Sequence, residues 1–204
     1  MPSRNIIKEY APDSYYHVYA RGVSKQKVFL EAKDYHYFYS IFERYLSKEI
    51  AKSKTGEPYP NYHNNIKLIA YCLMTNHFHL LVYQKEINDL QKFMRSVMTS
   101  YSRYFNLKYK RSGPVFESRF KASRINKDQY LMHITRYIHL NPRRWQNYYN
   151  SSLRYYSGLT SPEWLDISPV MELFASIDDY MKFVADYEEL RNMLAELKYQ
   201  LADQ

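Results

Sequence analysis

The chain has 204 residues, a length that suits one domain or one domain with a helical appendage. Its one cysteine, Cys72, excludes an internal disulfide framework and any metal site made of several thiolates. The longest apolar runs are far too short to cross a bilayer, and residues 1–5 lack the apolar region of a secretory signal, so we expect a cytoplasmic protein.

The net charge of +8 is concentrated in one segment. Residues 90–127 hold ten lysines and arginines against one acid, whereas residues 145–204 hold four bases against ten acids. Basic charge gathered in this way suits a polyanionic partner such as a nucleic acid, and the alternative is a solvated basic face without a partner. The residues that we expect to contact nucleic acid are Arg21, Arg95, Arg103, Arg111, Arg119, Lys121 and Arg124.

The first half of the chain predicts three strands and a helix. Residues 15–23 are rich in aromatic and β-branched side chains and predict a strand. Residues 33–50 place apolar side chains near helical spacing and predict an amphipathic helix. Residues 53–65 contain glycine, prolines and asparagines and predict a loop. Residues 66–74 and 77–84 are apolar runs joined by a two-residue turn and predict a β-hairpin.

The second half predicts a further strand among helices. Residues 87–109 form a second amphipathic pattern, and residues 115–125 alternate in a way that predicts a fourth strand. A third helix is expected over residues 126–141, followed by helical patterns at residues 169–176 and 178–201.

This order of elements predicts an α+β fold of the ferredoxin-like type, with an antiparallel sheet and helices on one face. We expect residues 1–144 to form this domain and residues 145–204 to form a C-terminal helical extension that packs on it. Because the fold serves many unrelated functions, the function must be argued from particular residues.

Two histidines stand on one predicted strand. Side chains alternate between the faces of a strand, so His77 and His79 point to the same side, about 7 Å apart. Two such imidazoles can bind one divalent ion, and manganese, magnesium, zinc and nickel all remain open, whereas calcium prefers oxygen ligands. The alternative is two separately satisfied histidines. Leu81 occupies the next position on that face, which disfavours the three-histidine site of the histidine-triad hydrolases.

The third helix carries the other candidate residues. Asn126 can cap its free amides, Gln129 fits a capping box, and Pro142 ends it. At about 100° per residue the helix has two distinct faces. One stripe carries Tyr130, His133, Tyr137 and Asn141, and another, apolar stripe carries Leu131, Ile134 and Ile138.

Tyr137 and Asn141 stand one turn apart on the stripe away from the core, as a nucleophile and a metal ligand would. Attack of a tyrosine on a phosphodiester stores the bond as a phosphotyrosine ester, and an ion would neutralise the phosphate charge. His133 and Lys127 are both candidates for the base that takes the phenol proton. The alternative is that Asn141 only terminates the helix and Tyr137 only packs.

Together these segments resemble a known family. His77-Phe78-His79 is similar to the histidine–hydrophobic–histidine motif of the HUH endonucleases. Residues 136–142, Arg-Tyr-Ile-His-Leu-Asn-Pro, resemble the tyrosine helix of the REP-associated tyrosine transposases, which are related to the IS200-like single-tyrosine transposases. The resemblance covers about residues 10–187, and the other segments that fit it are residues 15–23, 104–106, 113–121 and 151–156.

The resemblance implies a particular chemistry. Tyr137 would be the nucleophile, forming a 5′-phosphotyrosine link and leaving a free 3′-hydroxyl, while His77, His79 and Asn141 would bind Mg²⁺ or Mn²⁺. The substrate would be single-stranded DNA with a hairpin, handled in the cytoplasm at the nucleoid. Family members with a C-terminal extension can act as monomers, whereas the insertion-sequence relatives are dimers that exchange the tyrosine helix. The acidic segment after Trp145 would favour a monomer by folding back over the DNA groove.

Several alternatives remain at this point. Tyr101 and Tyr104 on the second helix are rival nucleophiles, because related enzymes differ in where the tyrosine helix falls. A domesticated member could retain the motifs without cleaving DNA. A non-catalytic single-strand nucleic-acid-binding module has the same fold, and a metal-dependent phosphodiesterase could act through water with Tyr137 structural.

Overall fold

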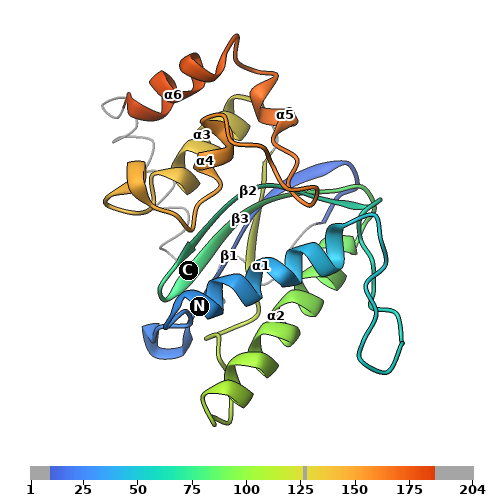
Figure 1. The fold of residues 1–204 in the computed structure, drawn as a ribbon. Coiled ribbons are helices and arrows are strands. Elements are labelled where there is room, and N and C mark those ends of the chain that lie inside the picture. Colours follow the sequence, from blue (N-terminus) through green and yellow to red (C-terminus); the bar gives the residue numbers. More distant parts are fainter. Residues whose placement is uncertain (1–9, 126–127, 187–204) are drawn as a thin grey trace, which may run out of the picture.

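Four antiparallel strands form one sheet in the order β2-β3-β1-β4 (Figure 1). The computed structural model describes residues 10–125 and 128–186. This strand order, with two helices on one face, confirms the predicted ferredoxin-like α+β arrangement. The strands are β1 (Ser14–Arg21), β2 (Ile66–Met74), β3 (His77–Gln84) and β4 (Lys121–Ile125).

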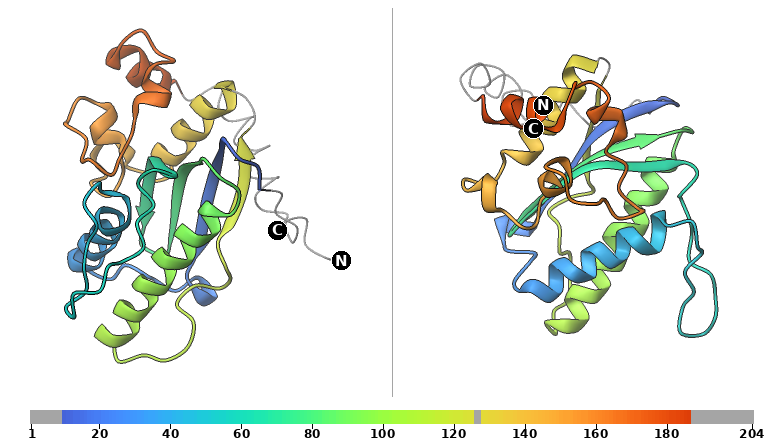
Figure 2. Two further views of the ribbon diagram at one scale, coloured as in Figure 1. Left: turned by 90° about the vertical axis from the view of Figure 1, so that its right-hand side faces the viewer. Right: turned by 45° about the horizontal axis from the view of Figure 1, so that its top comes forward.

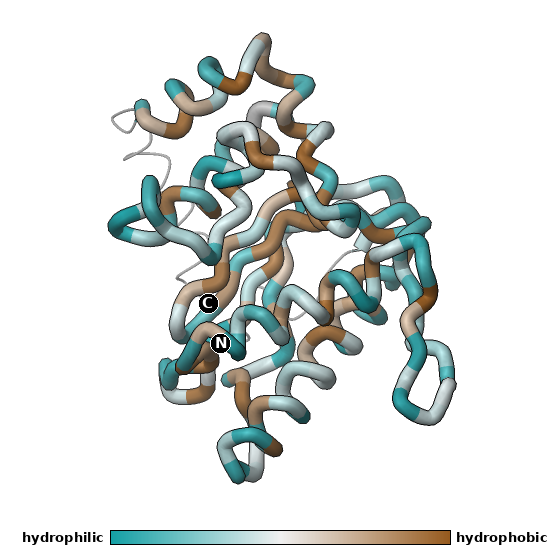
Figure 3. The backbone as a smooth tube through the Cα atoms, viewed as in Figure 1, coloured by the Kyte–Doolittle hydropathy of each residue, from teal (hydrophilic) through white to brown (hydrophobic). Residues whose placement is uncertain are grey.

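Two long helices, α1 (Ala32–Leu46) and α2 (Asp89–Lys108), cover one face of the sheet (Figure 2). Their apolar stripes meet the sheet in a single core, in which Phe38, Phe78 and Tyr101 are fully buried. The apolar runs of β2 and β3 give these two strands hydrophobic colouring (Figure 3), as expected for strands covered on both faces.

Asp34 holds the start of α1 against the end of α2. Its buried carboxylate accepts hydrogen bonds from the Leu30 and Glu31 amides at 2.7 and 3.1 Å and ion-pairs with Lys108. Two phenols of α2 and its C-cap, Tyr104 and Tyr109, donate to the same carboxylate. Burial alone would raise the pKa of Asp34, but these donors hold that pKa below its ordinary value.

The opposite face of the sheet is covered by α3 (Asp128–His139) and by the chain that follows it (Figures 1 and 2). Residues 150–152 pair with the outer edge of β2: Leu73 N–H donates to Asn150 O, and Ser152 N–H donates to Tyr71 O, both at 2.9 Å. The short helices α4 (Leu153–Tyr156), α5 (Ser168–Met171) and α6 (Ile177–Ala185) pack with α3 in a second core on this face, and single 3-10 turns lie at Val23–Lys25 and Trp145–Asn147.

Some element boundaries differ from prediction. The fourth strand begins at Lys121, not at residue 115, because Val115 and Phe116 are buried in a loop, where Phe116 bridges to Gly22. That bridge lies where the chain turns tightly: a Cβ on Gly22 would stand 2.2 Å from the Gln26 carbonyl oxygen.

In the second half, the helix expected at residues 169–176 is the four-residue α5, and α4 was not predicted. The predicted cap at Asn126 lies outside the described residues, as does the part of the last predicted helix beyond residue 186. Within the described ranges, no helix is both long and apolar enough to cross a membrane.

Candidate active site

The face of the sheet under α3 carries a row of imidazoles. Strand alternation sends His17 and Arg21 of β1, and His77 and His79 of β3, to this side. The register pairs Arg21 with His77 and Tyr19 with His79, so the candidate ligands lie beside two polar residues of the neighbouring strand.

Each of the two predicted metal ligands has one ring nitrogen engaged by a neighbour. Nδ1 of His79 lies 2.9 Å from Nε2 of His17, and Nδ1 of His77 lies 2.7 Å from Oδ1 of Asn76. The centroids of the His77 and His79 rings are 5.1 Å apart, with the ring planes nearly perpendicular. Neighbours that engage Nδ1 fix the ring orientation and direct Nε2 outward, which is how metal-binding histidines are usually supported.

Helix α3 brings the phenol and the amide to these rings. The Tyr137 ring meets the His79 ring edge-on at 5.5 Å between centroids and the His17 ring at 5.7 Å. One turn later, Oδ1 of Asn141 lies 3.1 Å from Nε2 of His77. The two-stripe interpretation of this helix is confirmed, because the members of the apolar stripe, Leu131, Ile134 and Ile138, are buried against the sheet.

Burial sets the protonation of the site. It lowers the pKa of His17 to about 3 and holds the pKa of His79 well below its ordinary value. The pKa of His77 is also lowered by burial, although its contact with Oδ1 of Asn141 acts in the opposite direction. Neutral imidazoles are the form that binds a metal ion. Burial raises the pKa of the Tyr137 phenol, while Arg21 and the Asn141 side chain act in the opposite direction.

The side chains that could donate to a metal ion here are therefore two imidazoles and one amide. Among residues 10–125 and 128–186, no group of three histidine, cysteine or carboxylate side chains is placed to hold an ion. The 3.1 Å between His77 Nε2 and Asn141 Oδ1 is close to the roughly 3 Å that separates adjacent ligands of an octahedral ion bound at about 2.1 Å. Together with the engaged Nδ1 atoms, this spacing fits a small divalent cation.

Buried polar contacts hold α3 in place. His139 is fully buried, with Nδ1 2.6 Å from the Tyr180 hydroxyl and Nε2 2.8 Å from the Ser152 hydroxyl. Arg136 donates to the carbonyl oxygens of Phe183 and Asp186 at 2.9 and 3.1 Å, and its guanidinium lies 3.9 Å from the Phe183 ring. The helix that carries Tyr137 is thus bound to the C-terminal part of its own chain.

The predicted nucleic-acid contacts are split between the two faces. Arg21 and Lys121 lie at the site, with Lys121 Nζ 5.5 Å from the Tyr19 ring, itself 5.7 Å from His79. Arg124 is exposed on the edge strand β4, and Arg119 is exposed in the loop before it. The three residues on α2 or at its C-terminal end lie on the opposite face of the sheet: Arg95, Arg103 and Arg111.

Both rival nucleophiles belong to the α1–α2 face. The Tyr101 hydroxyl is buried and donates to Val28 O, and Tyr104 donates to Asp34. Of the candidate bases, His133 accepts a hydrogen bond on Nδ1 from Arg136, and Lys127 lies outside the described residues.

His17 was not singled out from the sequence, although it stands at the centre of the site. A signal was present: the period-two pattern of the first strand places His17 and Tyr19 on the same face as Arg21.

Comparison with known protein families identifies the family of this chain. The model of the family described as "Transposase IS200 like" matches residues 11–141, which include the histidine strand and Asn141. The chain belongs to the IS200-like transposases. A search of curated protein sequences finds no match.

Two solved structures resemble the chain. One is a REP-associated tyrosine transposase bound to a REP hairpin, with a TM-score of 0.57 and 13% identity over 79% of this chain and 91% of that one. The other is a protein described as a transposase of Deinococcus radiodurans R1, with a TM-score of 0.41 and 13% identity over 65% of this chain and 93% of that one. The first likeness shows a shared fold, and the family assignment makes a DNA-cleaving enzyme the functional class of this chain.

Proposed function

We propose that this transposase nicks and rejoins single-stranded DNA through a covalent link to Tyr137, with a divalent metal ion at the site. The observation that carries the proposal is the meeting of α3 with β3. The Tyr137 ring lies 5.5 Å from His79, and Asn141, one turn further, reaches to 3.1 Å from His77. The proposed nucleophile and two of the proposed metal donors are thus brought together by these contacts.

The residues proposed to hold the ion, Mg²⁺ or Mn²⁺, are His77, His79 and Asn141. For His79 to present Nε2, its Nδ1–H must donate to His17, and the low pKa of His17 keeps that acceptor neutral. When bound, the ion would neutralise the negative charge that builds on the phosphate oxygens.

Tyr137 is proposed to attack the phosphorus as its phenol loses a proton. The bond from the phenol oxygen to phosphorus forms, the bond from phosphorus to the 3′-oxygen breaks, and the leaving oxygen takes a proton. The products are a 5′-phosphotyrosine and a free 3′-hydroxyl, and the reverse attack by a 3′-hydroxyl rejoins the strand. Because burial raises the pKa of Tyr137, the phenol is protonated at neutral pH, and the nearby Arg21 favours the phenolate.

The proposed substrate is single-stranded DNA that contains a hairpin. A REP-associated tyrosine transposase with this fold was solved with a REP hairpin. In the present chain, Arg21 and Lys121 flank the imidazoles, whereas Arg124 is exposed on β4 and Arg119 in the loop before it. Phosphates need such cations at the entrance to the site.

We also propose that the transposase works as a monomer, with residues 145–204 as an extension of the catalytic domain. His139 and Arg136 attach the tyrosine helix to residues 152–186 of the same chain. Exchange of α3 between two subunits would break these buried contacts, so the nucleophile and the metal ligands would come from one chain.

A covalent-adduct assay tests the proposal. The protein is incubated with a labelled single-stranded hairpin from the flanks of its own gene, with Mn²⁺ or with EDTA, and run on a denaturing gel. We expect a Mn²⁺-dependent adduct that Tyr137→Phe abolishes and Tyr130→Phe, a matched change on the same stripe of α3, retains. Binding without any adduct would indicate a non-catalytic nucleic-acid-binding protein, and cleavage without an adduct would indicate a water-dependent phosphodiesterase.

A further inference from the structure

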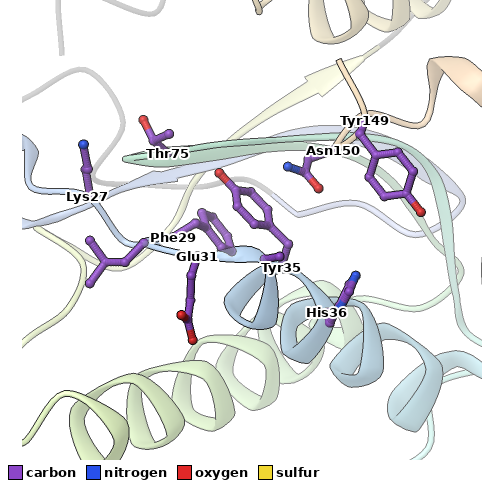
Figure 4. Close-up of a pocket in the computed structure, with 10 residues that line it drawn as sticks. Lys27, Phe29, Glu31, Tyr35, His36, Thr75, Tyr149 and Asn150 are labelled. Atoms are coloured by element: carbon purple, nitrogen blue, oxygen red, sulfur yellow. The ribbon is translucent and has the colours of Figure 1, made fainter. Parts of the chain in front are cut away.

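We propose that a cavity beside the β2–β3 turn binds one unpaired nucleobase of the DNA strand that reaches the active site. The inference rests on the proposed function. The cavity has a volume of about 350 Å³, at the small end of ligand sites. Its lining combines rings with polar side chains from the segment before α1, α1 itself, the β2–β3 turn and the segment before α4 (Figure 4): Lys27, Phe29, Tyr35, Thr75, Tyr149 and Asn150.

The cavity lies next to the proposed metal site along the chain. Thr75 lines the cavity, and the next residue, Asn76, accepts the hydrogen bond that orients His77. The Thr75 carbonyl also accepts the amides of Val28 and Phe29 at 2.8 and 3.0 Å, which ties the cavity wall to the turn. A strand whose phosphate lies at His77 therefore needs to pass only around this turn to place a base in the cavity.

Two tyrosines provide surfaces for stacking. Tyr35 is stacked on the buried Phe29 ring, with 4.6 Å between centroids and 13° between planes, so its position is fixed. Tyr149 is 63% exposed, which is unusual for so large a ring, and the Arg154 guanidinium lies 4.2 Å from its centroid. An exposed aromatic ring backed by a cation is the kind of platform on which unpaired bases stack.

The polar groups of the cavity suit a base and its phosphate. Asn150 accepts the Tyr39 hydroxyl on Oδ1 at 3.0 Å, which leaves its amide N–H groups for a ligand carbonyl. Glu31, the acid in the lining, is paired with Lys108 at 2.7 Å. Lys27 is exposed at the rim, and within the described residues no acid is paired with it, so its charge can meet a phosphate.

The test compares a strand with bases and a strand without them. Binding of labelled dT20 and of an abasic 20-mer with the same backbone is measured at fixed salt, in the Tyr137→Phe protein so that nothing is cleaved. We expect Tyr149→Leu to weaken binding of dT20 roughly 5- to 150-fold, the range for losing one base–aromatic stack, and to leave the abasic strand unchanged. Tyr149→Phe keeps the ring and should bind both strands as the parent does.

Variants of Lys27, the cation at the rim of the cavity, provide a second, independent test. Lys27→Ala should weaken both strands alike and reduce the salt dependence, because it removes a phosphate contact. Lys54→Ala, a matched loss of charge on the exposed loop that precedes β2, should change neither. Equal losses of affinity for the two lysine variants would show that the DNA is attracted only by the general positive charge of the protein. That result would overturn a phosphate contact at Lys27.

Crosslinking locates the base directly. Oligonucleotides carrying 5-iodouracil are irradiated in the complex, and the modified peptide is identified by mass spectrometry. Adducts at Tyr149 or Tyr35 support the inference, and adducts confined to other parts of the chain overturn it. If the parent protein binds dT20 strongly and Tyr149→Leu leaves that binding unchanged, only the proposed base-binding role of the cavity is overturned. If the parent protein does not bind single-stranded DNA at all, the proposed function is overturned as well.

Discussion

On the face covered by α1 and α2, the sheet buries Phe78 against Phe38 and Tyr101, in a core made almost entirely of apolar and aromatic side chains. On the face covered by α3, the same strands bury His17 and His79. Burying polar rings costs free energy unless they are hydrogen bonded. Both faces therefore stabilise the sheet through apolar contacts, and the face under α3 also holds neutral imidazoles in place.

The first prediction separates these two roles. Phe38→Ala should lower the free energy of unfolding by about 3–5 kcal/mol, because it removes a fully buried ring and leaves a cavity. The molecules that remain folded should form the DNA adduct at the rate of the parent protein. Denaturant unfolding and single-turnover adduct assays below the unfolding transition measure the two effects. Loss of adduct formation in fully folded Phe38→Ala would show that the two faces are not independent.

The second prediction is the pH dependence of the α1–α2 face. The pKa of Asp34 is lowered by its donors in the folded state, so the stability that its ionised form contributes is present above the unfolded pKa of about 3.9. This stability is lost as the pH falls through the lower, folded pKa. Asp34→Asn should cost about 1.5–3 kcal/mol at pH 7, and the difference from the parent protein should shrink in acid. A difference that stays constant from pH 7 to pH 3 in denaturant titrations would contradict this account.

The third prediction concerns His17 and the proposed ion. His17→Leu should weaken Mn²⁺ binding about 10- to 100-fold, the usual effect of removing the partner of a metal-binding histidine, and titration calorimetry measures it. His17→Gln, which can still accept the hydrogen bond from His79, should recover part of the affinity. Exposed His36 on α1 provides the control, since His36→Ala should leave Mn²⁺ binding unchanged. Equal affinities for the parent and His17→Leu would remove His17 from the support of the site.

The fourth prediction, which has the smallest expected effect, compares two positively charged residues on opposite faces of the sheet. Lys121 lies over Tyr19 on the active face, whereas Arg103 is exposed on α2, on the other face. If DNA follows the active face, Lys121→Ala should reduce the slope of log affinity against log salt by about one. Arg103→Ala should leave that slope unchanged. The opposite result would move the DNA path to the α1–α2 face, where Arg95 and Arg111 also lie.

Local patterns were sufficient to predict much of this structure. The hairpin β2–β3 and the two stripes of α3 follow from the spacing of apolar residues alone, and both are as expected. The start of β4 could not be predicted in this way, because Val115 and Phe116 are as buried as strand residues but lie in a loop.

Contacts distant in sequence explain the other omissions. A single histidine on a buried strand has the same pattern whether it packs or supports a metal ligand, so His17 became visible only beside His79, 62 residues away. The attachment of α3 is similar, since His139 meets Tyr180 across 41 residues of chain. No spacing rule connects such partners, and the fold has to bring them together.

The position of the covalent link is the most direct test of the central claim, that the phenol on α3 acts over the imidazoles of β3. The adduct formed with a hairpin oligonucleotide and Mn²⁺ is digested, and the peptide that carries the nucleotide is identified by mass spectrometry. The account predicts a 5′-phosphotyrosine at residue 137 and nowhere else. A nucleotide on Tyr101 or Tyr104 would contradict it, because both hydroxyls lie on the other face of the sheet.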